Sequence, residues 1–244
     1  MPVNDLLHRN GLPIVQSDDS FRYTLDSLLL AYYTPLAPSA TKIIDLCSGN
    51  APIPLYLSLR TAAQIDAVDH HNPAKINGEA SIRLNQLEDQ ITYHLLDATT
   101  CYKTLGHDVY DVVTCNPPYF SSSQHQIKSK IPLQASARHE VSITLEDVII
   151  AGKRLLKNKG VLSLIHRTER LDELLQLCIK HQMVVKTMRF VHSQATEPAN
   201  VVLVTIKKGA KSGSLQVLPP VITLDEFHQN SEQIKAIYDG RFVL

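Results

Sequence analysis

The amino-acid sequence predicts an α/β protein with a doubly wound, mostly parallel seven-stranded sheet and an antiparallel terminal hairpin. Short apolar runs alternate with segments of helical periodicity, which favours parallel strands joined by right-handed crossovers. Near the end of the chain, two apolar runs follow each other with no helix between them, as in an antiparallel hairpin. A chain of 244 residues is long enough for one substantial core, so we expect a single domain over residues 1–244.

The first half of the chain contains four expected strands and three expected helices. The strands are the apolar runs 42–46, 64–69, 91–95 and 110–115. Apolar helices are expected at 25–32 and around 54–59. A third helix is predicted from apolar residues that recur at helical spacing, namely Ile76, Ala80, Leu84 and Leu87.

The second half begins with a helix, because Thr144 and Asp147 have the spacing of a capping box before an apolar face. Gly160 is expected to end this helix, and a strand follows at 161–166. A helix over 171–178 then leads to the two hairpin strands, 184–191 and 199–206. Two segments fall outside the pattern: residues 1–34, and a tail over 208–244 in which 215–223 could form a short strand interrupted by two prolines.

The composition excludes some classes of protein and leaves others open. The 24 basic and 24 acidic residues cancel, which neither supports nor excludes a nucleic-acid partner, because a local basic patch is what attracts phosphates. No run approaches the ~18 apolar residues that a membrane span needs. The four cysteines are far apart and the N-terminus does not resemble a secretory signal, so we expect a cytoplasmic protein with reduced thiols. The eleven histidines show no metal-ligand spacing, so no metal is expected.

Polar side chains follow four successive expected strands at the point where each strand ends. They are Asp45, Asp69, Asp97 and Asn116. In open α/β sheets, ligands bind outside the carboxyl ends of the strands, so these residues should border one pocket. Asp69 lies 24 residues after Asp45 (69 − 45), about where a carboxylate accepts hydrogen bonds from ribose hydroxyls in dinucleotide folds. The pattern predicts a nucleoside-containing cofactor without deciding between NAD and S-adenosylmethionine.

The motif Asn116-Pro117-Pro118-Tyr119 favours S-adenosylmethionine. Consecutive prolines make a rigid strand exit, which suits the positioning of a reactive group. An adenine amino nitrogen or a glutamine amide nitrogen is a poor nucleophile because its lone pair is delocalised. The Asn116 side-chain oxygen and the Pro117 carbonyl could accept hydrogen bonds from its N–H groups and hold it in line with a sulfonium methyl. Tyr119 offers an aromatic face on which a flipped-out base could stack.

These residues resemble the amino methyltransferases with an (Asn/Asp)-Pro-Pro-(Tyr/Phe) motif. More narrowly, nearly the whole chain resembles the bacterial valine tRNA (adenine-37 N6)-methyltransferase family and its Gram-positive relatives. The more specific pieces are QSDDSFRYTLDSLLLA (16–31) and EPANVVLV (197–204). The others are IIDLCSGN (43–50), NQLEDQI (85–91), DVVTCNPPYF (111–120), ARHE (137–140), TLEDVI (144–149) and HRTERL (166–171), with Asp69 and Asp97.

The resemblance implies a Rossmann-like methyltransferase fold and methylation of adenine N6 next to a tRNA anticodon, with S-adenosylmethionine as donor. It implies that the N-terminal segment helps to close the cofactor pocket, with Tyr23, Thr24 and Asp26 as candidates. The methionine end of the cofactor would lie against Asp45, Ser48, Gly49 and Asn50, the ribose against Asp69 and the adenine against Asp97. As a hypothesis of our own, Lys128, Lys130 and Arg138 contact RNA phosphates.

One departure from the family pattern leaves two alternatives open. Cys47 stands at a usual glycine position, and Ala51-Pro52 replaces a glycine followed by a small residue. Because alanine resists positive φ and proline lacks a donor, this turn could weaken cofactor binding. One alternative is therefore a non-catalytic RNA-binding module on a methyltransferase-like fold. The other is a protein glutamine N5-methyltransferase, although such enzymes carry a sizeable helical domain before the first strand, where about 40 residues stand here.

Overall fold

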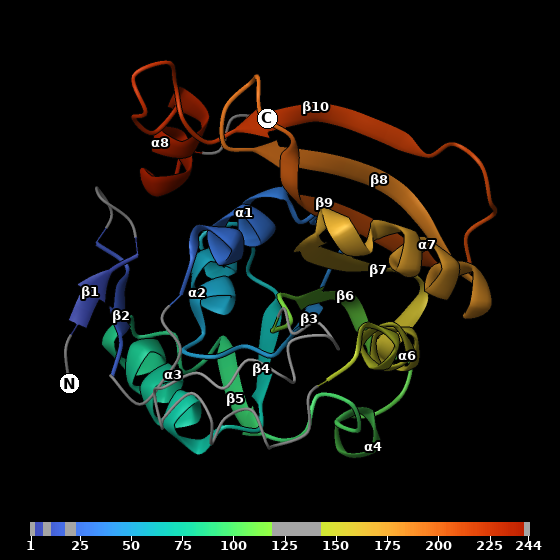
Figure 1. Cartoon of the computed structure of the whole chain (residues 1–244). Coiled ribbons are helices and arrows are strands. Elements are labelled where there is room, and N and C mark those ends of the chain that lie inside the picture. The colour runs from blue at the N-terminus through green and yellow to red at the C-terminus, as the bar shows by residue number, and fades with distance from the viewer. Residues whose placement is uncertain (1–2, 7–10, 18–22, 119–142, 242–244) are drawn as a thin grey trace, which may run out of the picture.

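A computed structural model describes residues 3–6, 11–17, 23–118 and 143–241 and contains one eight-stranded sheet (Figure 1). The strand order is β10-β8-β9-β7-β6-β3-β4-β5. The strands are β3 (Lys42–Leu46), β4 (Gln64–Asp69), β5 (Ile91–Leu95), β6 (Tyr110–Cys115), β7 (Leu156–Arg167), β8 (Met183–His192), β9 (Ala199–Lys208) and β10 (Gln216–Ile222). Only β9 runs against its neighbours, β7 and β8, and the other pairs in this sheet are parallel. The expected doubly wound, mostly parallel sheet with an antiparallel hairpin is confirmed, but it has eight strands and not the expected seven, because the segment with two prolines also pairs as β10.

The eighth strand, β10, lies at the edge of the sheet and contains the two prolines that interrupt the segment. Its pairing with β8 shifts register between Leu218 and Val221, so Pro219 and Pro220 fall where the ladder is already irregular. An edge position tolerates proline because one side of the strand needs no partner. The hairpin strand β9 is inserted between β7 and β8 rather than placed at the edge.

Helices cover both faces of the sheet (Figure 1). One hydrophobic cluster joins Ile43, Ile65 and Val112 of the sheet to residues of α1, α2, α3 and α8. A second cluster joins the alternate residues Ile44 and Val113 to α6 and α7 and to the segment around α4. The helices are α1 (Leu25–Tyr33), α2 (Pro52–Ser58), α3 (Asn72–Leu84), α4 (Tyr102–Leu105), α6 (Leu145–Leu155), α7 (Leu171–Lys180) and α8 (Glu232–Tyr238). Burial on both faces explains why the parallel strands read as continuous apolar runs.

The helix predicted from Ile76, Ala80 and Leu84 exists, but its buried side is a different one. Ile76 and Leu84 are 45% and 50% exposed, whereas small or polar residues are buried, among them Ala74, Asn77, Gly78 and Ser81. A short N-terminal hairpin of β1 (Val3–Asp5) and β2 (Pro13–Val15) covers this polar side. Its Val15 amide donates to Ser81 Oγ over 2.9 Å, so a polar helix face is buried with its hydrogen bonds made.

The exit from α6 differs from the prediction that Gly160 ends the helix. The Thr144–Asp147 capping box is present, but the helix ends at Leu155 and β7 starts at once. Lys208 stabilises this exit, because its Nζ donates to the carbonyls of Lys153 and Leu156, each over 2.7 Å. Lys153 lies in the last turn of α6 and Leu156 is its C-cap, where a helix leaves acceptors without an intrahelical donor.

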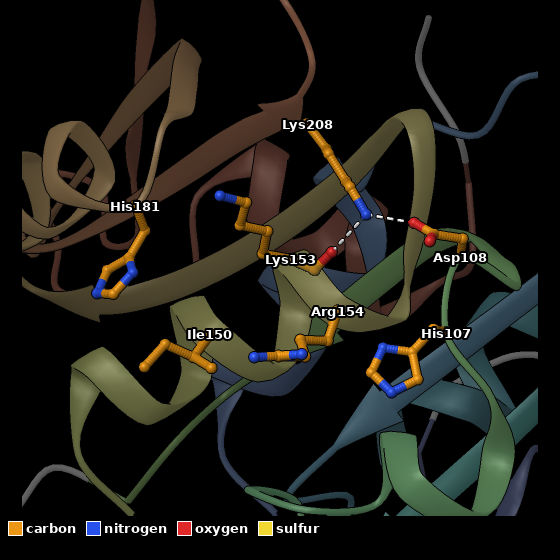
Figure 2. Close-up of a pocket in the computed structure, with 7 residues that line it drawn as sticks. All are labelled: His107, Asp108, Ile150, Lys153, Arg154, His181 and Lys208. Carbon is orange, nitrogen blue, oxygen red and sulfur yellow. Dashed lines mark hydrogen bonds and ion pairs between the residues drawn. The ribbon is translucent and has the colours of Figure 1, made fainter.

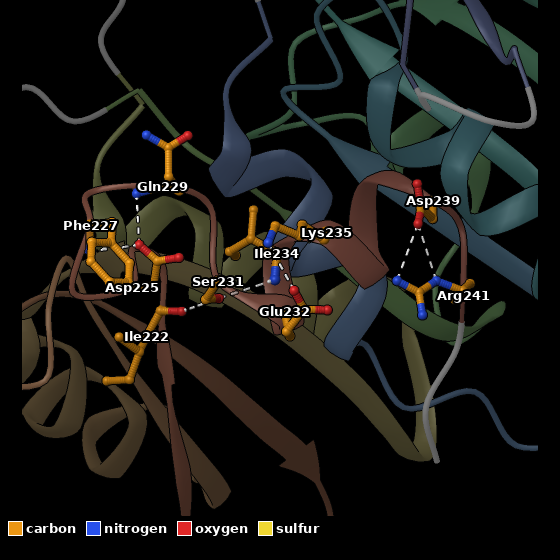
Figure 3. Close-up of polar contacts among 10 residues, drawn as sticks. All are labelled: Ile222, Asp225, Phe227, Gln229, Ser231, Glu232, Ile234, Lys235, Asp239 and Arg241. Atoms are coloured by element: carbon orange, nitrogen blue, oxygen red, sulfur yellow. Dashed lines mark hydrogen bonds and ion pairs between the residues drawn. The ribbon is translucent and has the colours of Figure 1, made fainter.

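The C-terminal segment packs α8 against α1 and α2. Ser231 caps α8 by accepting from the Ile234 amide, and its hydroxyl donates to the Ile222 carbonyl over 2.6 Å (Figure 3). Asp225 accepts the amides of Phe227 and Gln229 and so shapes the preceding turn. The buried Tyr56 hydroxyl of α2 donates to the Ile237 carbonyl over 2.8 Å. Within the described part of the chain, no helix combines the length and apolar character that crossing a membrane demands.

Candidate cofactor and catalytic site

The candidate site lies where the strand order reverses, between β3 and β6. Strand connections run outward in opposite directions from this point, which leaves a crevice at the carboxyl ends of the strands. In the β3–β6 register Asp45 pairs with Thr114 and Leu46 with Cys115. The turn after β3 and the Asn116 motif after β6 are therefore neighbours, although they are more than 60 residues apart in sequence.

The turn after β3 is built from three residues with positive φ. These are Cys47 at 57°, Gly49 at 53° and Ala51 at 67°. The left-handed conformation costs an L-residue roughly 1–2 kcal/mol, so Ala51 adopts the strained conformation that the sequence argument considered unfavourable for alanine. The turn is held by two backbone bonds of 2.9 Å, from the Ser48 amide to the Val68 carbonyl and from the Ala51 amide to the Ser48 carbonyl.

The helix that follows this turn offers few amide donors. Pro52 is its first residue and costs no helical hydrogen bond there, because the N–H of that position has no intrahelical partner. Pro54 removes another amide from the first turn, which leaves Ile53 as the only donor among residues 52–54. A pyrophosphate normally binds to several amides at such a helix start. The turn therefore fits a ligand without phosphate groups better than it fits a dinucleotide.

Asp69 and Tyr93 fix the backbone of Gly49, Asp69 through its amide and Tyr93 through its carbonyl. Asp69 Oδ2 accepts from the Gly49 amide and Oδ1 from the His71 amide, each over 2.9 Å. The Tyr93 hydroxyl of β5 donates to the Gly49 carbonyl. Burial and the Asp69 carboxylate raise the pKa of this phenol, so it is a stable donor. Gly78 of α3 makes room for the ring, because any β-carbon there would overlap Tyr93.

Asp45 is a fully buried carboxyl group at the end of β3. Burial raises its pKa to about 7, and the Asp69 carboxylate acts in the same direction, whereas the Thr114 and Ser48 hydroxyls lower it. Thr114 Oγ1 donates to Asp45 Oδ1 over 2.6 Å. Asp45 Oδ2 and Ser48 Oγ have no hydrogen-bond partner of good geometry among the described residues. Buried polar atoms of this kind call for a ligand or water.

Asn116 is fixed by a residue that the sequence reasoning missed. Its Nδ2 donates to Oγ of Ser27 in α1 over 3.2 Å. Ser27 is only 6% exposed, and Asn116 is half-buried beside the buried Pro117. The bond turns the amide so that its oxygen is presented away from Ser27. The sequence signals for Ser27 were its place in the segment 16–31 that resembles the family and a small polar residue before the leucines of a mostly apolar helix.

The remaining expected residues are placed as follows. Asn50 is buried in the turn after β3, and Thr24 is the exposed N-cap of α1, one residue before it begins. Tyr23 packs on the core and donates its hydroxyl to the Asp5 carbonyl over 3.2 Å, while Asp26 lies in the first turn of α1. Asp97 accepts from the Thr99 amide and hydroxyl, each over 2.8 Å, after β5. Pro118 is exposed.

Four expected residues lie outside the described residues, namely Tyr119, Lys128, Lys130 and Arg138. Their assigned roles rest on the sequence alone. In the described ranges, no group of three or more His, Cys, Asp or Glu side chains could hold a metal ion.

Comparisons with known proteins show similarity over most of the chain. The chain is 27% identical to a tRNA1(Val) (adenine(37)-N6)-methyltransferase of Aeromonas hydrophila over 186 residues, which is 75% of each chain. A crystal structure from Agrobacterium tumefaciens, described as a predicted O-methyltransferase, has a TM-score of 0.69 at 21% identity and covers 90% of this chain and 98% of that one. The TYW2 protein of Pyrococcus horikoshii, solved in complex with MeSAdo, has a TM-score of 0.54 at 10% identity and covers 85% of this chain and 73% of that one. No family model matches the chain. The expected fold and the resemblance stated from the sequence are confirmed.

Proposed function

We propose that this chain transfers a methyl group from S-adenosylmethionine to the exocyclic N6 of an adenine in tRNA, next to the anticodon. The observation that carries the proposal is the position of the Asn116 amide. It is bound by Ser27, is followed by two prolines that make the end of β6 rigid, and lies beside the strained turn that Asp69 holds through the Gly49 amide. The curated relative named for this reaction supports the choice of tRNA and nucleotide.

The residues around the turn fit S-adenosylmethionine. When bound, this cofactor supplies an electrophilic methyl group on a cationic sulfur. Its ammonium and sulfonium charges suit a site with carboxylates, and the buried Asp45 Oδ2 has no hydrogen-bond partner of good geometry among the described residues. Asp69 accepts the Gly49 and His71 amides, one on each oxygen, and a carboxylate oxygen can accept a second hydrogen bond, which we assign to the ribose hydroxyls. The shortage of amides at the start of α2 argues against a pyrophosphate.

Each expected residue then has one role. Asp45, Ser48, Gly49 and Asn50 hold the methionine end, Asp69 the ribose and Asp97 the adenine. Tyr23, Thr24 and Asp26 close the pocket from the N-terminal side of α1. Lys128, Lys130 and Arg138 contact phosphates of the RNA, and Tyr119 stacks on the target base.

Asn116 and Pro117 act on the amino group of the target. Asn116 Oδ1 and the Pro117 carbonyl each accept one N–H of the amino group, which orients the nitrogen lone pair toward the methyl carbon. The nitrogen becomes more positive as the N–C bond forms and the S–C bond breaks, so both acceptors stabilise the transition state more than the ground state. The extra proton on the product nitrogen passes to solvent, and no general base is required.

The proposal is tested with tritiated S-adenosylmethionine and unmodified tRNA, followed by digestion and identification of the labelled nucleoside. Label is expected in N6-methyladenosine, and Asn116→Ala should lower the rate by about 10²–10³-fold, as the loss of a transition-state hydrogen bond does in other enzymes. The matched control is Asn230→Ala, which replaces an exposed asparagine in the turn before α8 and should leave the rate unchanged.

Two other outcomes would contradict the proposal. Cofactor binding without label in tRNA would favour a protein glutamine substrate, whose amide nitrogen needs the same two acceptors. A protein that binds tRNA but gives neither label nor a cofactor-dependent shift in melting temperature would be a non-catalytic module.

A further inference from the structure

A pocket of about 400 Å³ lies beside the start of β6 and the end of α6 (Figure 2). This is the end of the sheet opposite the carboxyl ends of the strands, where the candidate site lies. It is lined by His107, Asp108, Ile150, Lys153, Arg154, His181 and Lys208. Asp108 lies just before β6 begins, and Lys208 ends the antiparallel strand β9, whereas Asn116 follows the other end of β6. Six residues of extended strand correspond to about 20 Å, which is the approximate separation of the two places.

The cations of this pocket fall into two kinds. Lys208 is used by the fold, because its Nζ binds Asp108 and the carbonyls of Lys153 and Leu156. The Lys153 and Arg154 side chains have no acidic partner among the described residues, and the Arg154 guanidinium lies 5.4 Å from the Tyr102 ring. Figure 2 shows the Lys153 and Arg154 side chains extending from the end of α6 toward the same side, one above the other.

Folding also joins two basic clusters that are about 50 residues apart in sequence. Lys153, Arg154, Lys157 and Lys159 surround the exit from α6, and Lys207, Lys208 and Lys211 lie at the end of β9. In the β7–β9 register Lys207 pairs with Val161, which brings the second cluster beside the first. Asp111 and Asp108 each pair with one of these lysines, Lys157 and Lys208. The remaining cations still leave this end of the sheet locally positive in a chain of zero net charge, as a surface for phosphates must be.

We propose that the pocket binds phosphates of the tRNA backbone, on the stem that leads away from the target base. This inference rests on the proposed function, because it assumes a tRNA with its loop in the candidate site. Helix α6 runs from the edge with the candidate site to the edge with the pocket, so a stem lying along this helix would pass Lys153 and Arg154. Lys153 and Arg154 supply two cations for a diester anion, with His107 beside them, whereas His181 binds the Glu146 carboxylate through its Nε2. Contacts of this kind position the RNA and leave sequence recognition to the candidate site.

The test compares tRNA affinity at several salt concentrations by fluorescence anisotropy, using an unmodified tRNA transcript. The variant Lys153→Gln/Arg154→Gln should weaken binding about 10-fold near 0.1 M salt. It should also lower the log–log salt slope by about 1.4–1.8, since each lost phosphate contact removes ~0.7–0.9. The control Arg83→Gln/Lys235→Gln removes the same charge from α3 and α8 and should change neither quantity. Affinity for S-adenosylmethionine and the transfer rate at saturating tRNA should stay unchanged in both variants.

The charge-preserving variant Lys153→Arg/Arg154→Lys separates charge from folding and should restore the wild-type slope. Unchanged affinity and slope in Lys153→Gln/Arg154→Gln would overturn the pocket proposal and leave the proposed function intact. Weaker binding with an unchanged slope, or loss of cofactor binding, would also overturn it, because either result indicates structural damage. If the wild type neither binds nor methylates tRNA, the proposed function fails, and the pocket proposal fails with it.

Discussion

Replacing Ser27 by alanine tests whether the Asn116 amide must be oriented to act. Ser27 Oγ is the acceptor that fixes Asn116 Nδ2 at 3.2 Å. Without it, the Asn116 amide loses the bond from its Nδ2 to Ser27, and its oxygen is held less firmly toward the amino group of the target. The variant should therefore slow methyl transfer while binding S-adenosylmethionine normally.

The expected size follows from the bond that is lost. A neutral hydrogen bond contributes about 0.5–1.5 kcal/mol, and 1.4 kcal/mol corresponds to a 10-fold change in rate. We expect kcat to fall about 2- to 10-fold, less than for Asn116→Ala, which removes the acceptor itself. Stability should change little, because alanine fills nearly the same buried space as serine and has the higher helix propensity, by less than ~0.7 kcal/mol.

The assay is single-turnover transfer from labelled S-adenosylmethionine at saturating tRNA, with cofactor affinity measured separately. Ser27→Thr keeps the hydroxyl and should retain most of the rate. If Ser27 acts through Asn116, the double variant Ser27→Ala/Asn116→Ala should be no slower than Asn116→Ala alone. The reasoning would be refuted if Ser27→Ala transferred methyl groups at the wild-type rate. It would also be refuted if Ser27→Ala slowed the Asn116→Ala variant as much as it slows the wild type.

Three further predictions concern the turn and two buried titratable groups. Gly78→Ala should displace the Tyr93 ring, lower the free energy of unfolding by about 1–3 kcal/mol and weaken cofactor binding. Tyr93→Phe should weaken cofactor binding with little loss of stability. Calorimetry measures cofactor binding and urea unfolding measures stability in both variants. Since folding raises the pKa of Asp45 from 3.8 to about 7, its contribution to the free energy of unfolding should decrease from pH 4 to pH 7, and Asp45→Asn should abolish that decrease of a few kcal/mol. His166 has the opposite sign: burial, assisted by the Arg170 charge, lowers its pKa from 6.5 to about 4. Stability should therefore be lost between pH 6.5 and 4, and His166→Gln, followed by urea unfolding at each pH, should remove a loss of roughly 2–3 kcal/mol.

The parallel strands were predictable because they are buried on both faces and therefore read as apolar runs. Helix α3 was found by its periodicity, but its buried side was not evident, because polar groups such as Ser81 are satisfied by a hairpin from another part of the chain. The early end of α6 was missed for a similar reason. Its last carbonyls are satisfied by Lys208, more than 50 residues away, and not by a local glycine signal. Where a distant residue decides a boundary, local sequence cannot reveal it.

The place of the candidate site was predictable from strand ends, whereas the residues that hold it were not. Asp45, Asp69 and Asn116 follow buried runs, and parallel strands bring their carboxyl ends to one edge. Tyr93 and Gly78 reach the same turn from the middle of their own elements, so no strand-end rule finds them. The doubt about Ala51 had the correct physical basis, since the residue does take positive φ, and its effect on cofactor binding stays a prediction.

Helix α1 connects the two halves of the proposed reaction. Its first turn contains Ser27, which orients Asn116 and so acts on the amino group of the target. Residues 23–26, which we assign to the cofactor, come directly before Ser27 in the sequence. The other end of the helix is fixed, because Arg60 Nη1 donates to the carbonyls of Ala31 and Thr34. A helix anchored at its C-terminus gives Ser27 a defined position relative to the sheet. Loss of the Ser27 hydroxyl should therefore reduce kcat alone, whereas a displacement of the whole helix, as in Arg60→Ala, should impair cofactor binding and kcat together.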